Sequence, residues 1–514
     1  MKLPVLVEDL PLITEMDKIP LNVIIRGLEA QYSVSKSEYW ASYLVYFYYE
    51  EFKKYLNEEK FEKARVTLEK AKGVLYDYRY HFYYGLLFSK LGDYENAEVE
   101  LKRSISMNET FSLGYYELGN ILYLKKDYDE AVQSYLKAFE LNKDFALPLL
   151  KLGDTYFESG QLTDAEIAYK SALKVEKLPE IYLRLGVLYN EKNQFNKAEK
   201  MFREGLSIEY KPEIAYNLSY TLSKLGKHFQ AMQILKELVK NFPAPEVFNE
   251  LGIIQKNLGL YEEAIESLKN AGEQFEENYI KARLFIEGIT DKLLMDLKKF
   301  DSEYAHFLEN AVKSKESIED KLTRIEYPFK DEISLIFNIT DDMGEINIEE
   351  FMNILGIKRV GDKRKEYITY LPYVLSGIYI SGGDPILIEK NATKTSVALY
   401  GDTEGLLLAK ALTMTYIGFL FTSEPLDSII QKILEQVSFI HYPFYQEVIK
   451  YLEENRTSME DFIDTFSEPS TTYEFIKYFL EILSYEPIVD DISPISSLTF
   501  GKILLFLLKV NAKT

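Results

Sequence analysis

Carboxylates gather in the segment 341–351, where Gly344 could form a sharp turn. Oxygen ligands at this kind of spacing bind calcium when an acid such as Glu350 closes the coordination sphere as a bidentate ligand. In that register, however, Ile339 and Met343 stand at two of the ligand positions. Losing two of about six oxygen ligands should abolish tight binding, so we expect a plain acidic turn before a helix and no metal site.

Other residue types that commonly carry out chemistry are scarce in this chain. Its 514 residues include no cysteine, which excludes a thiolate nucleophile, a disulfide and cysteine-ligated zinc. The histidines stand far apart, without metal-ligand spacing: His81, His228, His306 and His441. The pair Gly382-Gly383 lacks the later glycine and lysine of a phosphate-binding loop, so it predicts only a turn. The sequence therefore predicts neither an enzyme active site nor a cofactor.

Acidic side chains outnumber basic ones by 82 to 60, which gives a formal net charge of −22. Nucleic acid would be repelled by this charge unless a local basic patch overrode it. The densest basic run, residues 358–365, is short, and we interpret it as the solvated start of a helix. We therefore expect no nucleic-acid partner.

The first residues of the chain do not resemble a signal peptide. Residues 1–9 carry two acids where an uninterrupted run of about seven or more apolar residues would be needed. The most apolar run, residues 405–421, only reaches the lower limit of a membrane-spanning helix and has no basic residues at its flanks. We interpret it as a buried helix, and we expect a cytoplasmic protein without membrane contact.

Small residues recur at a nearly constant interval between residues 79 and 271. Five glycines stand 34, 34, 33 and 66 residues apart, and Ser219 divides the longest interval: Gly85, Gly119, Gly153, Gly186 and Gly252. An alanine follows each of these six positions after twelve residues: Ala97, Ala131, Ala165, Ala198, Ala231 and Ala264. Paired small residues mark two helices that cross closely, so the pattern predicts a series of helical hairpins.

This pattern resembles the tetratricopeptide repeat family, a helix-turn-helix module of about 34 residues. The signature residues of two consecutive units are Tyr115, Leu118, Gly119, Ala131, Tyr135 and Ala138, then Leu152, Gly153, Tyr156, Ala165, Tyr169 and Ala172. The chain departs from the signature where Ser219 replaces glycine and Lys143 replaces the closing proline. The resemblance implies a right-handed α-solenoid that binds another protein, without identifying that partner.

The expected fold is mainly α, with one small β-hairpin formed by residues 385–389 and 396–400. The predicted parts are an N-terminal lead-in and helix (1–44), a solenoid of six clear repeats and one degenerate repeat (45–272), capping and connecting helices (273–327), and a mostly helical globular domain (328–514). Short helices in the last part are expected at 349–355, 363–376, 403–421, 427–437, 444–454, 473–483 and 500–510.

The resemblance also implies that the first helix of each hairpin lines the inner face of the solenoid. The residues expected there to bind a partner form a strip that is aromatic and aliphatic in its middle: Phe82, Tyr116, Asn120, Tyr123, Leu150, Asp154, Phe157, Leu183, Asn190, Tyr216 and Tyr220. Family members that hold an acidic C-terminus use lysine, arginine and asparagine on this face, but here Tyr116 stands in place of the lysine. The strip suits a segment with hydrophobic anchors. Alternatively, these residues fill the space between adjacent helices or are covered by the C-terminal domain.

The sequence thus predicts a non-enzymatic scaffold or adaptor that binds a peptide or helix of a partner protein in an apolar concave groove. Two other functions remain open. The same surfaces could form a homodimer or larger homo-oligomer. Residues 328–514 could instead hold an active site regulated by the repeats, because carboxylate chemistry leaves little trace in one sequence.

Overall fold

The computed structural model describes residues 19–323 without a gap. Further along the chain it describes residues 335–336, 338–341, 344–358, 360, 374, 377–378, 380–401, 413, 435, 438–439, 442 and 446. The backbone contacts divide the chain into two compact units, unit 1 (Met1–Leu188) and unit 2 (Tyr189–Thr514).

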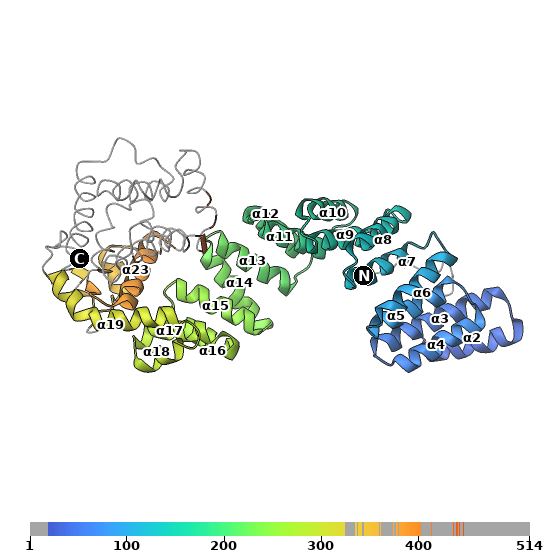
Figure 1. The fold of residues 1–514 in the computed structure, drawn as a ribbon, viewed down its shortest axis with the longest axis horizontal. Helices are drawn as coiled ribbons and strands as arrows, with labels where there is room; N and C mark the ends of the chain where they lie inside the picture. Colours follow the sequence, from blue (N-terminus) through green and yellow to red (C-terminus); the bar gives the residue numbers. More distant parts are fainter. Residues whose placement is uncertain are drawn as a thin grey trace, which may run out of the picture. The chain divides into compact units, whose positions relative to one another are not determined.

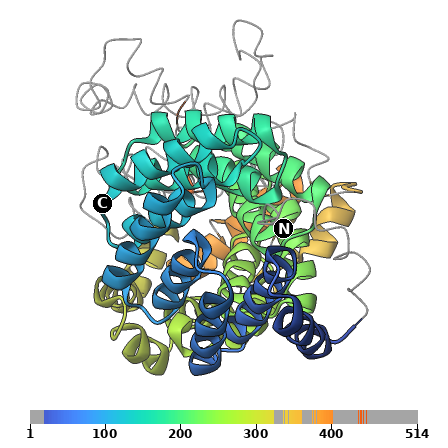
Figure 2. The same cartoon turned by 90° about the vertical axis from the view of Figure 1, so that its right-hand side faces the viewer.

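Unit 1 is built from helices that pair in chain order (Figures 1 and 2). They are α2 (Leu21–Ser35), α3 (Glu38–Asn57), α4 (Phe61–Val74), α5 (Tyr78–Lys90), α6 (Tyr94–Met107), α7 (Ser112–Leu124), α8 (Tyr128–Leu141), α9 (Leu147–Glu158) and α10 (Leu162–Val175), while α11 (Pro179–Glu191) crosses the boundary of the units. The hairpins are α3 with α4, α5 with α6, α7 with α8 and α9 with α10, and each packs on the next.

Unit 2 continues the same pattern and adds further helices. They are α12 (Phe195–Ile208), α13 (Pro212–Lys224), α14 (His228–Asn241), α15 (Pro245–Asn257), α16 (Tyr261–Ala271), the 3-10 helix η1 (Glu273–Phe275), α17 (Glu276–Glu287), α18 (Asp291–Leu297), α19 (Ser302–Thr323), α21 (Ile348–Ile354) and α23 (Pro385–Tyr400). Helix α17 packs on α16, where a capping helix is predicted. A buried cluster that includes Leu284, Leu293 and Leu308 joins α17, α18 and α19.

Small residues set the distance between the two helices of a hairpin. A methyl group at Gly153 would lie 2.4 Å from the ring of Tyr169, and one at Gly119 would lie 2.6 Å from the ring of Tyr135. No real side-chain contact is that short, so only glycine lets these tyrosines pack against the first helix. Ala165, on the second helix, is fully buried at 0% exposure. The close crossings predicted from the glycine and alanine spacing are therefore present.

The hairpin of α3 and α4 achieves its packing without the glycine. Phe52 stands at that position, is fully buried, and has its ring edge-on to Tyr83 of α5 with 5.3 Å between the ring centroids. Ala64 and Leu68 of α4 are also fully buried. A buried aromatic residue therefore stands at the glycine position of the first hairpin, where its ring packs against the next hairpin.

The β-hairpin predicted from residues 385–389 and 396–400 is wrong, because Pro385–Tyr400 forms a single helix, α23. Asp384 caps the start of this helix by accepting hydrogen bonds from two backbone amides of its first turn, at 2.9 and 3.1 Å. Gly401 ends it with a φ of 91°. Most side chains of α23 are buried, so its sequence lacks the polar face that reveals a helical period. Its β-branched residues suggested a strand, and tertiary packing overrides that preference.

Asn391, in the middle of α23, holds the backbone of the acidic turn that precedes α21. Its side-chain oxygen accepts a hydrogen bond from the amide of Ile346 at 3.2 Å. Its side-chain nitrogen donates to the carbonyl of Gly344 and to Ser381 Oγ, both at 2.9 Å. Asn391 is fully buried, so these bonds satisfy polar groups that water cannot reach.

The acidic turn leads directly into a helix, as the sequence predicts. Asp341 accepts a hydrogen bond from the amide of Glu345 at 2.8 Å, and Asn347 caps α21. The carboxylate of Glu345 forms ion pairs with Lys390 and Lys394 of α23. The turn is therefore tied to α23 through a carboxylate as well as through Asn391.

Other predicted elements lie outside the described residues. The predicted helices at 363–376, 403–421, 427–437 and 444–454 have only one described residue each, and those at 473–483 and 500–510 have none. The helix predicted at 349–355 corresponds to α21.

Replacing Gly153 by alanine should destabilise the repeats, because the new methyl group would press into the ring of Tyr169. We expect a loss of about 1–3 kcal/mol in the free energy of unfolding, the usual cost of overpacking. Gly73 of α4 provides the control, since no atom lies within 4 Å of a methyl group there. Gly73→Ala should stabilise the protein by about 0.5–1 kcal/mol. Urea unfolding followed by circular dichroism measures both, and equal effects would contradict the packing role of Gly153.

Replacing Asn391 by alanine should loosen the turn before α21. The amide of Ile346, the carbonyl of Gly344 and Ser381 Oγ would each lose one hydrogen bond, which we expect to cost about 1–3 kcal/mol and to speed amide exchange within residues 344–348. Hydrogen exchange read by mass spectrometry measures the local effect. Asn241→Ala, at the exposed end of α14, serves as the control. Unchanged exchange at 344–348 would show that Asn391 does not hold this turn.

Candidate functional site

The residues predicted to bind a partner divide into buried and accessible groups. Buried are Phe82, Tyr116, Leu150 and Asp154; partly exposed are Asn120, Tyr123, Phe157, Leu183, Asn190 and Tyr216; and Tyr220 is 40% exposed. The predicted strip therefore includes residues that pack inside the array. Partner binding by the accessible members stays a prediction.

The buried aromatic members connect successive hairpins. The ring of Phe82, on α5, lies 5.0 Å from the ring of Phe111, centroid to centroid, and Tyr116 of α7 lies 5.1 Å from Phe145 in the same way. Phe111 and Phe145 stand in the connections that lead to the next hairpins. Edge-on aromatic pairs of this kind fill the space between helices, so Phe82 and Tyr116 are structural residues.

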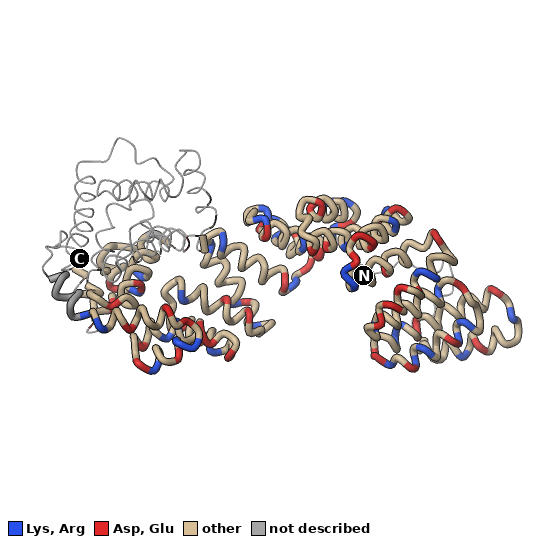
Figure 3. The backbone as a smooth tube through the Cα atoms, viewed as in Figure 1, with Lys and Arg blue, Asp and Glu red and all other residues tan. Residues whose placement is uncertain are grey.

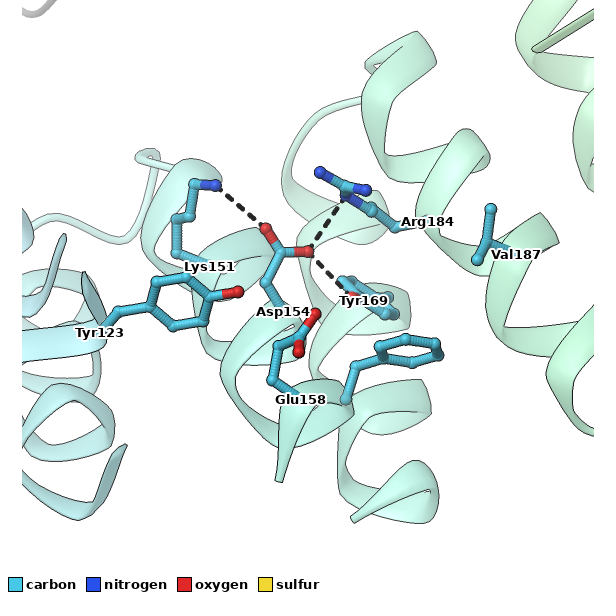
Figure 4. A pocket seen from close by; sticks show the side chains of 8 residues that line it. Tyr123, Lys151, Asp154, Glu158, Tyr169, Arg184 and Val187 are labelled. Atoms are coloured by element: carbon cyan, nitrogen blue, oxygen red, sulfur yellow. Dashed lines mark hydrogen bonds and ion pairs between the residues drawn. The ribbon is translucent and has the colours of Figure 1, made fainter. Parts of the chain in front are cut away.

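Asp154, on α9, is a buried carboxylate with three partners (Figure 4). Its Oδ2 lies 3.0 Å from Lys151 Nζ on the same helix, and its Oδ1 lies 3.2 Å from Arg184 Nε on α11. Tyr169 Oη, on α10, donates a hydrogen bond to Oδ1 at 2.9 Å. Burial raises the pKa of Tyr169 and the charge of Asp154 raises it further, so the phenol keeps its proton and remains a donor.

A cavity of about 130 Å³ lies beside Asp154 (Figure 4). Its lining residues are Tyr123, Lys151, Asp154, Phe157, Glu158, Tyr169, Arg184 and Val187. Pockets for cofactors and other small molecules usually measure about 300–1,000 Å³, so this one has room for a single side chain. Two cations and two carboxylates line it, so this part of the predicted strip is charged as well as aromatic.

Five of the lining residues are not members of the predicted strip: Lys151, Glu158, Tyr169, Arg184 and Val187. Lys151 and Arg184 each stand two residues before a repeat glycine, at a position that was not assigned to the inner face. The spacing of Lys151 and Asp154 could have revealed the first ion pair, because residues three apart in a helix are neighbours.

The same hydrogen bond recurs in two successive hairpins. Tyr135 Oη of α8 donates to Asn120 Oδ1 of α7 at 2.8 Å, as Tyr169 does to Asp154. Asn120 in turn donates from its amide nitrogen to Glu117 Oε2 at 3.0 Å. Burial raises the pKa of Glu117, although the hydrogen bond from Asn120 opposes part of that rise. Glu117 is thus a carboxylate in an environment that disfavours its charge.

Charged residues of both signs are interspersed along the helices of each unit (Figure 3). In the described ranges, no group of three or more His, Cys, Asp or Glu side chains is arranged to hold a metal ion. A search of the helices in those ranges also found none that is both long enough and apolar enough to span a bilayer.

Replacing Glu117 by glutamine should stabilise the protein at neutral pH. The folded state raises the pKa of Glu117, so this residue's contribution to stability is fully present below its unfolded pKa of about 4.3 and declines as the pH rises through the folded pKa. Glutamine carries no charge and can still accept the bond from Asn120. The midpoint of thermal unfolding should therefore rise at pH 7 and stay nearly unchanged at pH 3.5.

The control for this experiment is Glu109→Gln, which changes an exposed residue of the same unit. Surface substitutions of this kind usually change stability by less than about 0.5 kcal/mol. An equal gain at both pH values would show that the effect of Glu117→Gln does not come from its charge.

Sequence profiles of one family match most of the repeat region. A profile described as TPR repeat matches residues 119–160, and profiles described as tetratricopeptide repeat match residues 78–111, 148–177, 179–212, 213–244 and 245–271. Among curated proteins, none is similar enough to match this chain.

Solved structures show similar helical arrays at low sequence identity. Pseudomonas aeruginosa PilF is 17% identical, with a TM-score of 0.37 over 42% of this chain and 98% of that one. YrrB, a TPR protein with an unusual peptide-binding site, is 18% identical, with a TM-score of 0.32 over 36% of this chain and 97% of that one. Yeast Tom70 is 17% identical, with a TM-score of 0.38 over 55% and 60%.

The family profiles, the glycine spacing and the paired helices thus agree over the same residues. Residues 78–271 of this chain therefore belong to the tetratricopeptide repeat family.

Proposed function

We propose that this protein is a non-enzymatic cytoplasmic scaffold whose repeats hold a peptide or helix of a partner protein at the cavity beside Asp154. Tetratricopeptide repeats support a role in protein–protein interaction. The observation that carries the proposal is the cavity itself, which combines half-buried aromatic side chains with a fixed set of charges and has room for one side chain of a partner.

The lining of the cavity indicates what the partner offers. Tyr123, Phe157 and Val187 provide apolar contact area for one hydrophobic anchor. Arg184 Nε lies 3.2 Å from Asp154 Oδ1, and the side chain is 47% exposed, so its terminal N–H groups can donate to a backbone carbonyl of the partner. Asp154 partly neutralises both cations, which makes a carboxylate a weaker anchor here than an apolar side chain.

The two other functions have no supporting observation in the described residues. A homodimer would show a concentration-dependent mass in analytical sedimentation. An active site in residues 328–514 would fall mostly outside the described part of the chain.

Replacing Tyr123 and Phe157 together by alanine should weaken capture of the partner by about tenfold or more, because buried aromatic anchors each contribute more than about 1 kcal/mol to such interfaces. The whole chain, immobilised, is exposed to lysate from its native cells, and bound proteins are quantified by mass spectrometry. Circular dichroism checks that the helices persist.

Tyr210→Ala with Phe242→Ala is the matched control, since these rings are 54% and 45% exposed and lie outside the cavity. Proteins that the wild type and the control retain, but the Tyr123→Ala/Phe157→Ala variant loses, support the proposal. Identical recovery by all three would refute it, and loss of helicity would show that the two rings are structural.

A further inference from the structure

Lys224, at the end of α13, lies between two aromatic rings. Its Nζ is 5.5 Å from the ring centroid of Tyr220 on the same helix and 5.0 Å from that of Phe439. Phe439 comes from the C-terminal part of the chain, more than two hundred residues later. The ammonium group thus links a residue of the predicted binding strip, Tyr220, to a distant segment through cation–π contacts.

A second contact of the same segment lies three residues further on. The ring of Tyr442 meets the ring of Phe195, at the start of α12, with 5.2 Å between the centroids and an angle of 74°. Phe195 is buried within its hairpin, so Tyr442 packs edge-on against a fixed residue of the repeats. Two neighbouring hairpins therefore each contact one aromatic ring of this segment.

The spacing of the two rings fits this mode of contact. Phe439 and Tyr442 each have helical backbone, and they stand three positions apart, the interval at which side chains are neighbours on a helix. Tyr442 is further held by Gln446, whose Nε2 donates a hydrogen bond to Tyr442 Oη at 2.9 Å. Tyr442 thus contacts α12, and Phe439 contacts α13.

We propose that the surface formed by Phe195, Tyr220 and Lys224 is a docking site for a helical segment with two aromatic residues three positions apart, and that Phe439 and Tyr442 occupy it within the same chain. An external partner with the same aromatic spacing competes for this surface. It involves other residues than the cavity at Asp154, so the two proposals can fail separately.

The contact of Phe439 with the repeats is partial, because its side chain remains 62% exposed. Burial lowers the pKa of Lys224, and the charge of Glu250 partly offsets that effect. The segment with Phe439 and Tyr442 belongs to the same chain, so its effective concentration at this surface is high. A separate partner must overcome that advantage.

The test uses a fluorescent peptide with the sequence of residues 433–446, added to the whole chain and followed by anisotropy. The Phe439→Ala/Tyr442→Ala protein should bind the peptide at least about tenfold more tightly than the wild type, because its own segment no longer competes. A peptide with both aromatic residues replaced by alanine should bind at least about tenfold more weakly. When Lys224→Gln is added to the Phe439→Ala/Tyr442→Ala protein, the gain in affinity for the peptide should become smaller.

Acetylation of Lys224 by an amine-reactive ester, read by mass spectrometry, reports on the surface without any peptide. It should be faster in Phe439→Ala/Tyr442→Ala than in the wild type. Phe242→Ala/Phe300→Ala removes two rings of the same unit that are each 45% exposed and should leave the rate unchanged. Equal peptide affinity for wild type and variant, no binding to the variant, or an unchanged acetylation rate would overturn the proposal.

Discussion

The close approach of the two helices in each hairpin is the constraint on which the other features depend. Gly119 and Gly153 leave no side chain at the crossing, and the rings of Tyr135 and Tyr169 take up that space. Packing at this distance brings the tyrosine hydroxyl of the second helix to the residue that follows the glycine on the first. The steric requirement for glycine thus places the tyrosine hydroxyl, a hydrogen-bond donor, beside the residue that follows the glycine.

Asp154 is buried as a consequence of this packing, so its carboxylate needs hydrogen-bond and ion-pair partners inside the protein. Asp154 obtains one hydrogen bond from Tyr169 and two ion pairs from Lys151 and Arg184. Removing one partner of a buried charge is strongly destabilising, while the pair itself adds little net stability. The network defines the shape and charge of the cavity more than it strengthens the fold.

The repeat architecture could be predicted because glycine and alanine stand at fixed spacing and the required geometry is local to each hairpin. The inner face was harder to predict, since whether Tyr116 or Lys151 is accessible depends on how successive hairpins pack. Helix α23 was misassigned because a helix buried on most sides shows no polar face, although Asp384 and Gly401 marked its ends. The contacts of Phe439 and Tyr442 join residues that are distant in sequence, and no local pattern indicates such a pairing.

The bonds Asn120–Tyr135 and Asp154–Tyr169 each lie within a single hairpin, α7 with α8 and α9 with α10. Duplication or deletion of one whole hairpin would therefore add or remove the donor and the acceptor of this bond together. Neither the tyrosine hydroxyl nor its acceptor would be left without its partner. Arrays of different length can therefore evolve from such units without new hydrogen-bond partners inside each hairpin. The ion pair from Arg184 to Asp154 crosses between hairpins, and it marks a junction where the order of the units matters.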